Sequence, residues 1–447
     1  MAPVIALGAS AVALAGLPYW LPRLVVALRM WLFARINGPD GIAVPGEEVD
    51  ASQFLEVYAQ PAASGRSRGA ALSDLFWYWL SPGAEVHQEH LERGPRYDEV
   101  ARCTRRILSM PSLAAERLAA ACVRDALPDR TGLVRLRDLV MPVWAEFYHR
   151  LVFLRPSTGE VRQLIVDNAD DVITALKCCG LRHMDRRLRL TAHLERVLDE
   201  VPHGLPTLLD RRERAFYLQG TFFNTAVVQS SEATAHLLMV LAADESLQRA
   251  AREDGALDGI FEETLRRFPL FGVAHRITTD TMTLPTGSVI PSGSVLCFDY
   301  PEFHRSGGHI PFGVAANRPC PAWHLAPITV KAVTRELLDR FAFATAAAHT
   351  RPIPNRAPCL MSPRGARVRL RRPALVFLRV RDRWEDVGRS LTQLVLGTYM
   401  VWHARRLRLC QRYFERTDAA LASGLDRGGV GPAGGPDGSV RVVREAP

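Results

Sequence analysis

Apolar side chains in the first half of the chain recur at the spacing of helices. Between residues 47 and 220 they return every three to four positions, which predicts amphipathic helices. The clearest of these segments are residues 113–127, 142–154 and 161–179. Pro142 is expected to open the second of them, because proline is tolerated in the first turn of a helix. Short β-type runs between Pro and Gly turns follow at residues 281–297. The pattern therefore predicts a mainly α protein with a small β lobe.

The N-terminal segment has a different pattern. No side chain is charged from residue 1 to residue 22, and arginines follow at positions 23, 29 and 35. About 20 apolar residues suffice to span a bilayer, and basic residues after the span favour a cytoplasmic body. A cleaved signal peptide is disfavoured because no positive side chain precedes the apolar run. We therefore predict a membrane anchor over residues 1–36 and a membrane-associated protein whose catalytic body is cytoplasmic.

The C-terminal end predicts an amphipathic helical extension over residues 381–416. From Trp384 to Phe414 the apolar side chains fall roughly on one side, and a basic cluster occupies residues 405–412. Such a helix can lie on an anionic membrane or dock onto the chain's own body, and the sequence leaves both open. After Thr417 the chain turns to Gly, Pro and Asp, so residues 417–447 are predicted to be a disordered tail.

Composition fits one large body between these ends. The chain has 447 residues, of which 48% are hydrophobic, enough for a sizeable core. Its eight cysteines form no Cys-x-x-Cys pair, which suits a reducing compartment. The sequence contains no Walker A motif, no Gly-x-Gly-x-x-Gly motif and no internal repeat. Its arginines are scattered without a recognition motif, which argues against nucleic acid as a partner.

Cys320 is the main candidate for chemistry. It lies after a Phe-Gly turn and two residues after an arginine, and a helix-like run follows it. A thiolate on a loop that leads into a helix N-terminus is stabilised by the helix dipole and by backbone N–H groups. Such a thiolate can serve as a ligand of haem iron. A lone cysteine is more often a buried structural residue, so the argument depends on the surrounding pattern.

A second motif lies upstream of the cysteine. Glu263 and Arg266 are three residues apart on a predicted helix and can form an ion pair, as on many surface helices. The helix is followed by Phe-Pro-Leu, then by Ala-His-Arg at 274–276 and by Ile-Pro-Ser-Gly at 290–293.

The two motifs, in this order, resemble those of the cytochrome P450 family. That family's Cys loop reads Phe-Gly-x-Gly-x-Arg-x-Cys, and its K helix carries Glu-x-x-Arg before a propionate-binding strand. The resemblance is strongest over residues 215–345 and implies a cytochrome P450 fold over residues 37–380. It also implies haem b (heme b), whose iron would be ligated by the Cys320 thiolate.

The same resemblance implies roles for other residues around the haem. Arg276 would bind a propionate through charge-assisted hydrogen bonds, with Arg318 and His275 as helpers. Phe312 would pack near the thiolate. Arg105 would reach the second propionate, although no Trp or His stands where the family often has one. A solvated basic helix face is the alternative interpretation of Arg105.

The resemblance further implies a structural ion pair behind the haem. Glu263 and Arg266 would be buried there, with Arg305 as their third partner. Removing one partner of a buried pair leaves a stranded charge and costs about 3–5 kcal/mol.

The sequence departs from the family pattern around the cysteine. The segment before the Cys loop is short, and one extra residue lies between Gly313 and Arg318. The family's second glycine is missing, so Asn317 is expected to take the left-handed conformation, which Asn tolerates. Pro327 is expected inside the helix that follows, where proline is normally costly.

The oxygen-activating helix departs further. Counting back from the end of this helix places Val228 and Gln229 where the family has its acid–threonine pair, which relays protons. The Gln229 amide can donate and accept hydrogen bonds but cannot titrate. Ser230, Ser231 or Glu232 could stand in if the register differs by one to three residues. A plain buried helix with a polar stripe is the alternative.

The leading hypothesis is a haem-thiolate monooxygenase that oxidises a lipophilic small molecule by C–H hydroxylation or epoxidation. Electrons would come from a ferredoxin or a reductase, and the net charge of +9 suits an acidic donor. The altered helix supports an alternative, in which the enzyme rearranges or dehydrates its substrate or uses peroxide without reductive oxygen activation. A third hypothesis is a haem-poor relative that serves as a binding subunit.

Overall fold

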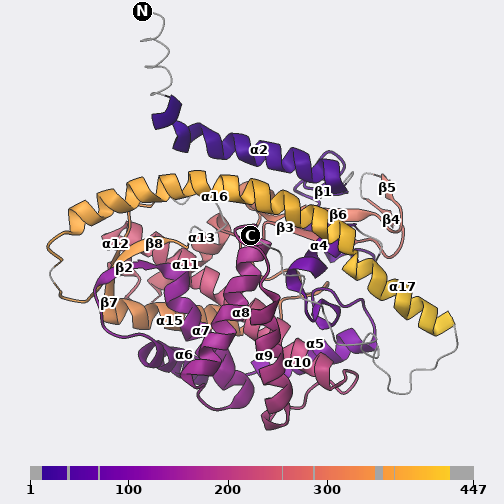
Figure 1. Cartoon of the computed structure of the whole chain (residues 1–447), viewed down its shortest axis with the longest axis horizontal. Helices are drawn as coiled ribbons and strands as arrows, with labels where there is room; N and C mark the ends of the chain where they lie inside the picture. Colours follow the sequence, from indigo (N-terminus) through magenta and orange to yellow (C-terminus); the bar gives the residue numbers. More distant parts are fainter. Residues whose placement is uncertain are drawn as a thin grey trace, which may run out of the picture.

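The computed structural model describes residues 13–37, 41–68, 71–253, 255–284, 287–347, 356–366 and 368–422. Within these ranges the protein is mainly helical and carries small sheets at the edge of its helical body (Figure 1). The predicted mainly α architecture with a small β lobe is therefore confirmed.

The short strands of the described residues pair into small sheets. The first sheet has the order β1 (Ile42–Val44), β6 (Val295–Asp299), β3 (Val273–Ile277). The second has the order β2 (Gly132–Arg135), β8 (Pro358–Pro363), β7 (Phe341–Ala344), and a hairpin pairs β4 (Met282–Thr283) with β5 (Val289–Ile290). β1 runs parallel to β6, and the other pairs are antiparallel. The predicted strand region at 281–297 therefore holds β4, β5 and the start of β6.

The helices predicted from apolar periodicity are present as α6 (Ser112–Ala126), α7 (Leu136–Phe153) and α8 (Gly159–Leu176). The expectation that Pro142 opens its helix is wrong, because α7 begins six residues earlier. Leu136 and Val140 are fully buried in the core, and their packing holds the helix together ahead of the proline.

Further helices complete the body. They are α3 (Phe54–Ala59), α4 (Ala71–Leu80), η1 (Ala84–Val86), α5 (Pro95–Leu108), α9 (Met184–Val197), η2 (Leu198–Glu200), α10 (Arg211–Gly220), η3 (Thr221–Ala226), α11 (Val227–Ala243), α12 (Glu245–Ala250), α13 (Ala256–Arg267), α14 (Tyr300–Arg305) and α15 (Leu325–Arg340). The segment η3 is a π-helix that continues directly into α11.

Helix α11 is the centre of the core. It contacts α7, α8, α13 and α15, and nearly every one of its side chains is buried. A helix surrounded in this way has no side that faces solvent, which explains why its sequence shows no amphipathic pattern. The polar side chains that it does carry are consequently enclosed by protein.

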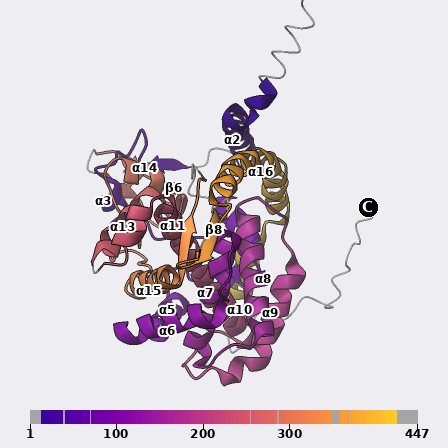
Figure 2. The same cartoon turned by 90° about the vertical axis from the view of Figure 1, so that its left-hand side faces the viewer.

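A helix near the N-terminal end of the described chain packs on one near its C-terminal end. Helix α2 (Leu17–Asn37) lies along α16 (Arg371–Leu407), and both views place α16 between α2 and the body (Figures 1 and 2). α16 begins ten residues before the predicted extension at 381–416. It ends at Leu407, and the next residue, Arg408, adopts a left-handed conformation with φ of 49°. A second helix, α17 (Leu409–Ala422), follows, so residues 417–422 of the predicted tail are helical and the rest lie outside the described residues.

The predicted membrane anchor at residues 1–36 receives no support from the described residues. Within them, the stretch that is long and apolar enough to cross a membrane is Arg211–Ala243, and most of it is buried inside the protein. Helix α2 instead carries Pro22 and arginines within its length and packs against α16. Membrane attachment with a cytoplasmic body stays a prediction.

A buried ion pair connects α4, α8 and α9. The Arg187 Nε atom donates to Asp171 Oδ2 at 2.6 Å, and Arg187 Nη1 donates to the carbonyl oxygens of Trp79 and Ser81. Both charged side chains are at most 1% exposed. Arg187 therefore donates hydrogen bonds to carbonyl oxygens at the end of α4, and water cannot replace these bonds because the site is buried.

We expect Arg187→Ala to lower the free energy of unfolding by about 3–5 kcal/mol, because it leaves the Asp171 carboxylate buried and unpaired. The matched control is Arg189→Ala on the same helix, whose partner Asp185 is exposed. That control should change the free energy by less than about 1 kcal/mol. Urea unfolding followed by circular dichroism measures both, and equal losses would contradict the assignment.

Candidate functional site

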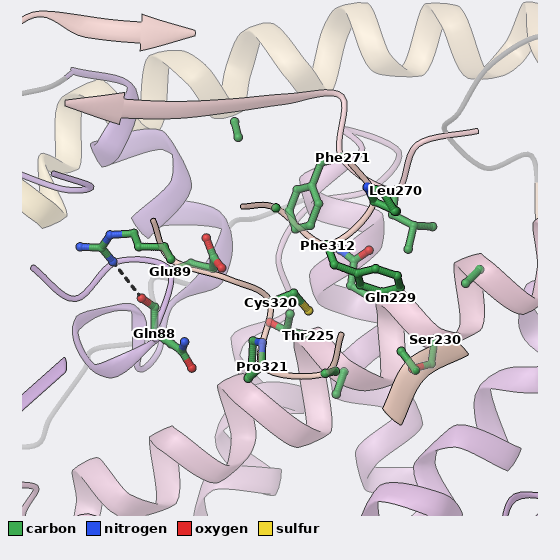
Figure 3. A pocket seen from close by; sticks show the side chains of 18 of the residues that line it. Gln88, Glu89, Thr225, Gln229, Ser230, Leu270, Phe271, Phe312, Cys320 and Pro321 are labelled. Carbon is green, nitrogen blue, oxygen red and sulfur yellow. Dashed lines mark hydrogen bonds between the residues drawn. The ribbon is translucent and has the colours of Figure 1, made fainter. Parts of the chain in front are cut away.

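One cavity brings together most of the residues predicted from the sequence. It has a volume of about 190 Å³, room for far more than one water molecule. The predicted residues that line it are Cys320, Gln229, Ser230, Phe312, His275, Arg276 and Arg318. In Figure 3, Cys320 lies at its centre, with Gln229 and Phe312 toward one side and Gln88 and Glu89 toward the other.

Cys320 is held in the cavity wall by a tight loop. Its backbone N–H donates to the Phe312 carbonyl oxygen at 3.0 Å, and its own carbonyl oxygen accepts from the N–H of Trp323. Burial raises the pKa of the Cys320 thiol to about 11, although the backbone N–H of Ala322 opposes this shift. The free thiol is thus neutral, and a metal that binds the sulfur must displace its proton.

The Cys loop compensates for its missing glycine in a different way from the one expected. Gly313 and Arg318 adopt the left-handed conformation, with φ of 72° and 54°, so the assignment of that role to Asn317 is wrong. Pro327 is the third residue of α15, a position whose backbone N–H has no partner within the helix. Proline therefore costs little there, which corrects the expectation of a strained helix interior.

Asn317 fastens the Cys loop to the N-terminal part of the body. This side chain is fully buried, and its Nδ2 atom donates to the carbonyl oxygens of Tyr58, Gln60 and Ala63 at 2.9–3.1 Å. Its Oδ1 atom accepts from Arg276 at 3.3 Å. The amide needs both a donor and an acceptor end here, which explains an asparagine at this position.

An arginine cluster, Arg66, Arg276 and Arg318, lines the cavity beside Cys320. Arg276 Nη2 donates to the Tyr58 hydroxyl at 2.7 Å, and Arg318 Nε donates to the Ser64 carbonyl oxygen at 2.7 Å. All of the cluster is at most 8% exposed. These contacts hold the guanidinium groups in place before any ligand arrives.

Arg66 reaches the cluster because a glycine precedes it. Gly65 pairs with Ile277 at the end of β3, and a Cβ atom at Gly65 would lie 2.7 Å from the Ile277 carbonyl oxygen. The close approach brings Arg66 Nη1 to the His275 carbonyl oxygen and Arg66 Nη2 to Glu89 Oε2, the latter at 2.9 Å. Without glycine the loop would stand away from the strand.

The charges of the arginine cluster are incompletely balanced. Burial lowers the pKa of Arg318 to about 10, and the neighbouring Arg66 charge contributes to this shift. Burial would raise the pKa of Glu89, but the Arg66 charge holds that pKa below its usual value. Among the described residues, Arg276 Nε and Arg318 Nη2 are buried without a hydrogen-bond partner. Buried cationic donors of this kind favour an anionic ligand.

The other wall of the cavity is formed by η3 and α11. The Gln229 Oε1 atom is buried and has no hydrogen-bond partner among the described residues. The Ser230 hydroxyl is 2.9 Å from the Tyr148 hydroxyl, and Tyr148 is fully buried. The predicted polar stripe of this helix is therefore present, and Gln229 keeps an unused acceptor on the cavity side.

Thr225 and His87 form a further polar pair in this wall. His87 Nε2 lies 2.7 Å from Thr225 Oγ1, and His87 Nδ1 accepts the backbone N–H of Glu89. Burial lowers the pKa of His87, so the ring is neutral and its proton resides on Nε2. This nitrogen is the one that lies within hydrogen-bond distance of the Thr225 hydroxyl.

The cavity opens through apolar side chains. Phe271 and Val273 both line it, yet they are 42% and 45% exposed. Phe271 follows α13 and Val273 begins β3, and Leu270 lies beside Phe271 (Figure 3). An opening of this composition suits a lipophilic molecule more than a charged one.

The remaining predicted site residues lie elsewhere. Arg105 is exposed on the outer face of α5, so its predicted contact with the cavity is wrong and the solvated-face alternative holds. Arg266 Nη2 pairs with Glu263 Oε1 at 2.7 Å, but the two side chains are 44% and 51% exposed rather than buried. Arg305 pairs with Glu302, not with them. The reason is that the inward positions of α13 are held by Phe261 and Leu265.

Sequence reasoning missed Arg66, Tyr58 and the His87–Thr225 pair. Arg66 and Tyr58 belong to a segment far from every recognised motif, and no spacing pattern marks them. His87 stands near His90 at a spacing that requires no metal, so the sequence gives it no role. Thr225 could have been found, since it is a threonine on the predicted oxygen-activating helix, one turn before Gln229.

The comparisons with known proteins concern the fold. No protein-family model and no curated protein matches this sequence. A variant of cytochrome P450 OleT, solved in complex with arachidonic acid, matches with a TM-score of 0.57 and 14% identity, over 71% of this chain and 88% of that chain. A cytochrome P450 from Thermus thermophilus matches with a TM-score of 0.51 and 17% identity, over 69% and 89%. A zebrafish cytochrome P450 solved with progesterone matches with a TM-score of 0.54 and 16% identity, over 70% and 92%. The chain therefore has the cytochrome P450 fold, as the sequence motifs predicted.

We expect Asn317→Ala to lower the free energy of unfolding by about 1–3 kcal/mol, since it leaves buried carbonyl oxygens unsatisfied. Thermal or urea unfolding measures this loss. The control Ala316→Ser changes an exposed neighbour in the same loop and should stay within about 0.5 kcal/mol of the parent. A neutral Asn317→Ala substitution would mean that the loop is held by other contacts.

Proposed function

We propose that the protein is a haem-thiolate enzyme that oxidises a lipophilic small molecule. The observation that carries the proposal is the shared cavity of Cys320 and the arginine cluster, within a cytochrome P450 fold. A soft sulfur ligand and buried cationic donors on one wall match an iron centre that carries carboxylate groups.

The residues of the cavity fit haem. Cys320 would hold the iron through its sulfur, and Arg276 and Arg318 would bind propionates through the N–H groups that have no partner among the described residues. Phe312 would pack against the ring beside the sulfur. Haem bound there would supply the oxidising chemistry, namely the activation of oxygen or of peroxide for transfer to a C–H or C=C bond.

The protein's own residues would position the substrate and a proton. The apolar opening at Phe271 and Val273 favours lipophilic molecules, and the structural neighbours solved with arachidonic acid and progesterone are consistent with this class. The neutral His87 ring would orient the Thr225 hydroxyl so that its proton faces the cavity. Thr225 would thereby take the place of the family's missing threonine.

The electron source distinguishes two versions of the proposal. In the first, a monooxygenase receives electrons from a ferredoxin or a reductase, and the net charge of +9 would attract an acidic donor. In the second, the enzyme uses peroxide or converts an already oxygenated substrate. Val228 and Gln229 favour this second version, because they stand where the family has its acid–threonine pair and neither side chain can deliver a proton by titration.

We expect the reduced wild-type protein to show the red-shifted carbon monoxide difference band of thiolate-ligated haem. Cys320→Ser should lose this band completely, because a serine oxygen does not replace the sulfur. The control Cys179→Ser alters a half-buried cysteine that does not line the cavity, and it should keep the full band. A persistent band in Cys320→Ser would exclude Cys320 as the ligand, and a wild-type protein without haem would favour the binding-subunit hypothesis.

The role of Thr225 is tested by comparing turnover with NADPH and a redox partner against turnover with hydrogen peroxide. If oxygen is activated reductively, Thr225→Val should reduce product per NADPH by at least about tenfold, while peroxide-driven turnover stays unchanged. Thr221→Val is the matched control, because Thr221 lines the cavity without a bond to His87. Gln229→Ala should also lower the amount of product per NADPH if the Gln229 amide organises the proton relay.

Turnover with peroxide alone would support the second version. Equal coupling in Thr225→Val and the parent protein, with NADPH as the electron source, would exclude Thr225 from proton delivery.

A further inference from the structure

Helix α16 presents its large apolar side chains to the outside. They lie three, four or seven residues apart along one exposed stripe: Phe377, Val380, Trp384, Leu391, Val395, Tyr399 and Trp402. Each of these side chains is 40–66% exposed. At 1.5 Å per residue the stripe extends for roughly 38 Å. We call this set the α16 stripe.

The inner face of the same helix is mixed in character. Its buried residues include both apolar and polar side chains: Leu378, Asp382, Val387, Ser390, Gln393, Met400, Val401 and Ala404. Gln393 Nε2, for example, donates to the Lys177 carbonyl oxygen at 2.9 Å. A surface helix of a water-soluble protein normally places its large apolar side chains on the inner face. The α16 stripe lies on the other side, so packing against the body does not account for it.

Helix α2 carries a second exposed stripe at the same end of the molecule. Its members are Trp20, Leu24, Leu28 and Trp31, which are 42–60% exposed. The Arg383 guanidinium of α16 lies 4.7 Å from the centre of the Tyr19 ring of α2. Both views show the two helices side by side at one end of the protein (Figures 1 and 2). We call this combined area the α2–α16 surface.

The charges on the α2–α16 surface are positive. Helix α2 has no acidic residue, and in α16 Asp382 is buried while Glu385 and Asp386 pair with arginines. Exposed arginines accompany the stripes at positions 23, 35, 372, 379 and 406. Among the described residues, no acidic side chain forms an ion pair with any of these five.

We propose that the α2–α16 surface lies in the interface of a bilayer that contains anionic phospholipids. Trp and Tyr side chains prefer the boundary between lipid tails and water, and arginines bind phosphate groups. An apolar stripe bordered by cations is the composition of helices that lie in the plane of a membrane. This inference does not depend on haem or on the proposed reaction.

A second copy of the chain is a poorer occupant of this surface. In a symmetric dimer the same patch meets itself, so the exposed arginines of one copy would face those of the other. A transmembrane orientation is also disfavoured, because α2 carries Pro22, Arg23 and Arg29 within its length and packs lengthwise on α16. The helices therefore lie on the membrane and do not cross it.

The test is flotation of the full-length protein with vesicles of phosphatidylcholine alone and of phosphatidylcholine mixed with phosphatidylglycerol. We expect binding to the mixed vesicles, and at least about tenfold weaker binding for the triple variant Trp384→Ser, Leu391→Ser, Val395→Ser. Arg379→Gln and Arg406→Gln should each weaken binding to mixed vesicles by about fivefold and leave binding to phosphatidylcholine unchanged.

The matched control removes one Trp, one Leu and one Val from other exposed sites: Trp323→Ser, Leu208→Ser, Val289→Ser. It should bind like the parent protein, and circular dichroism checks that both triple variants are folded. Equal binding of the two triple variants would overturn the proposal. A parent protein that ignores vesicles but forms a dimer, broken by the α16 variant, would overturn it in favour of a second copy.

Discussion

The burial of the arginine cluster is the constraint on which the site depends. Arg66, Arg276 and Arg318 come from three separate segments, and each guanidinium is held by backbone carbonyl or hydroxyl groups. Glu89 balances only part of their charge. Because buried cations are tolerated only when they are paired and hydrogen-bonded, these segments must close around the cavity together. The Cys loop belongs to the same arrangement, since Asn317 accepts from Arg276 and ties the loop to residues 58–63.

Local motifs in the sequence predicted much of this fold and site. Phe-Gly, Arg-x-Cys and the Ala-His-Arg strand lie within short windows, and their residues do line one cavity. The apolar periodicity likewise located α6, α7 and α8. Arg276 was predicted to bind an anionic group, and its Nε atom is buried without a hydrogen-bond partner among the described residues.

What the sequence could not predict depends on long-range packing. Glu263 and Arg266 are exposed because the opposite face of α13 packs against the core. A Glu-x-x-Arg motif does not indicate which face of its helix is buried. Arg66 joins the arginine cluster because Gly65 lets its loop approach β3 closely. The tautomer of His87 depends on a backbone N–H from Glu89. None of these contacts produces a periodic pattern or a motif of fixed spacing in the sequence.

The pairing of α2 with α16 has a consequence for synthesis of the chain. Helix α2 ends at residue 37 and its partner begins at residue 371, so more than 300 residues are translated between them. At about 5–20 residues per second, this interval lasts roughly 20 to 70 seconds. Throughout that time the side of α2 that α16 later covers has no partner within the nascent chain. A helix that is made late in translation therefore completes the packing of one that is made early.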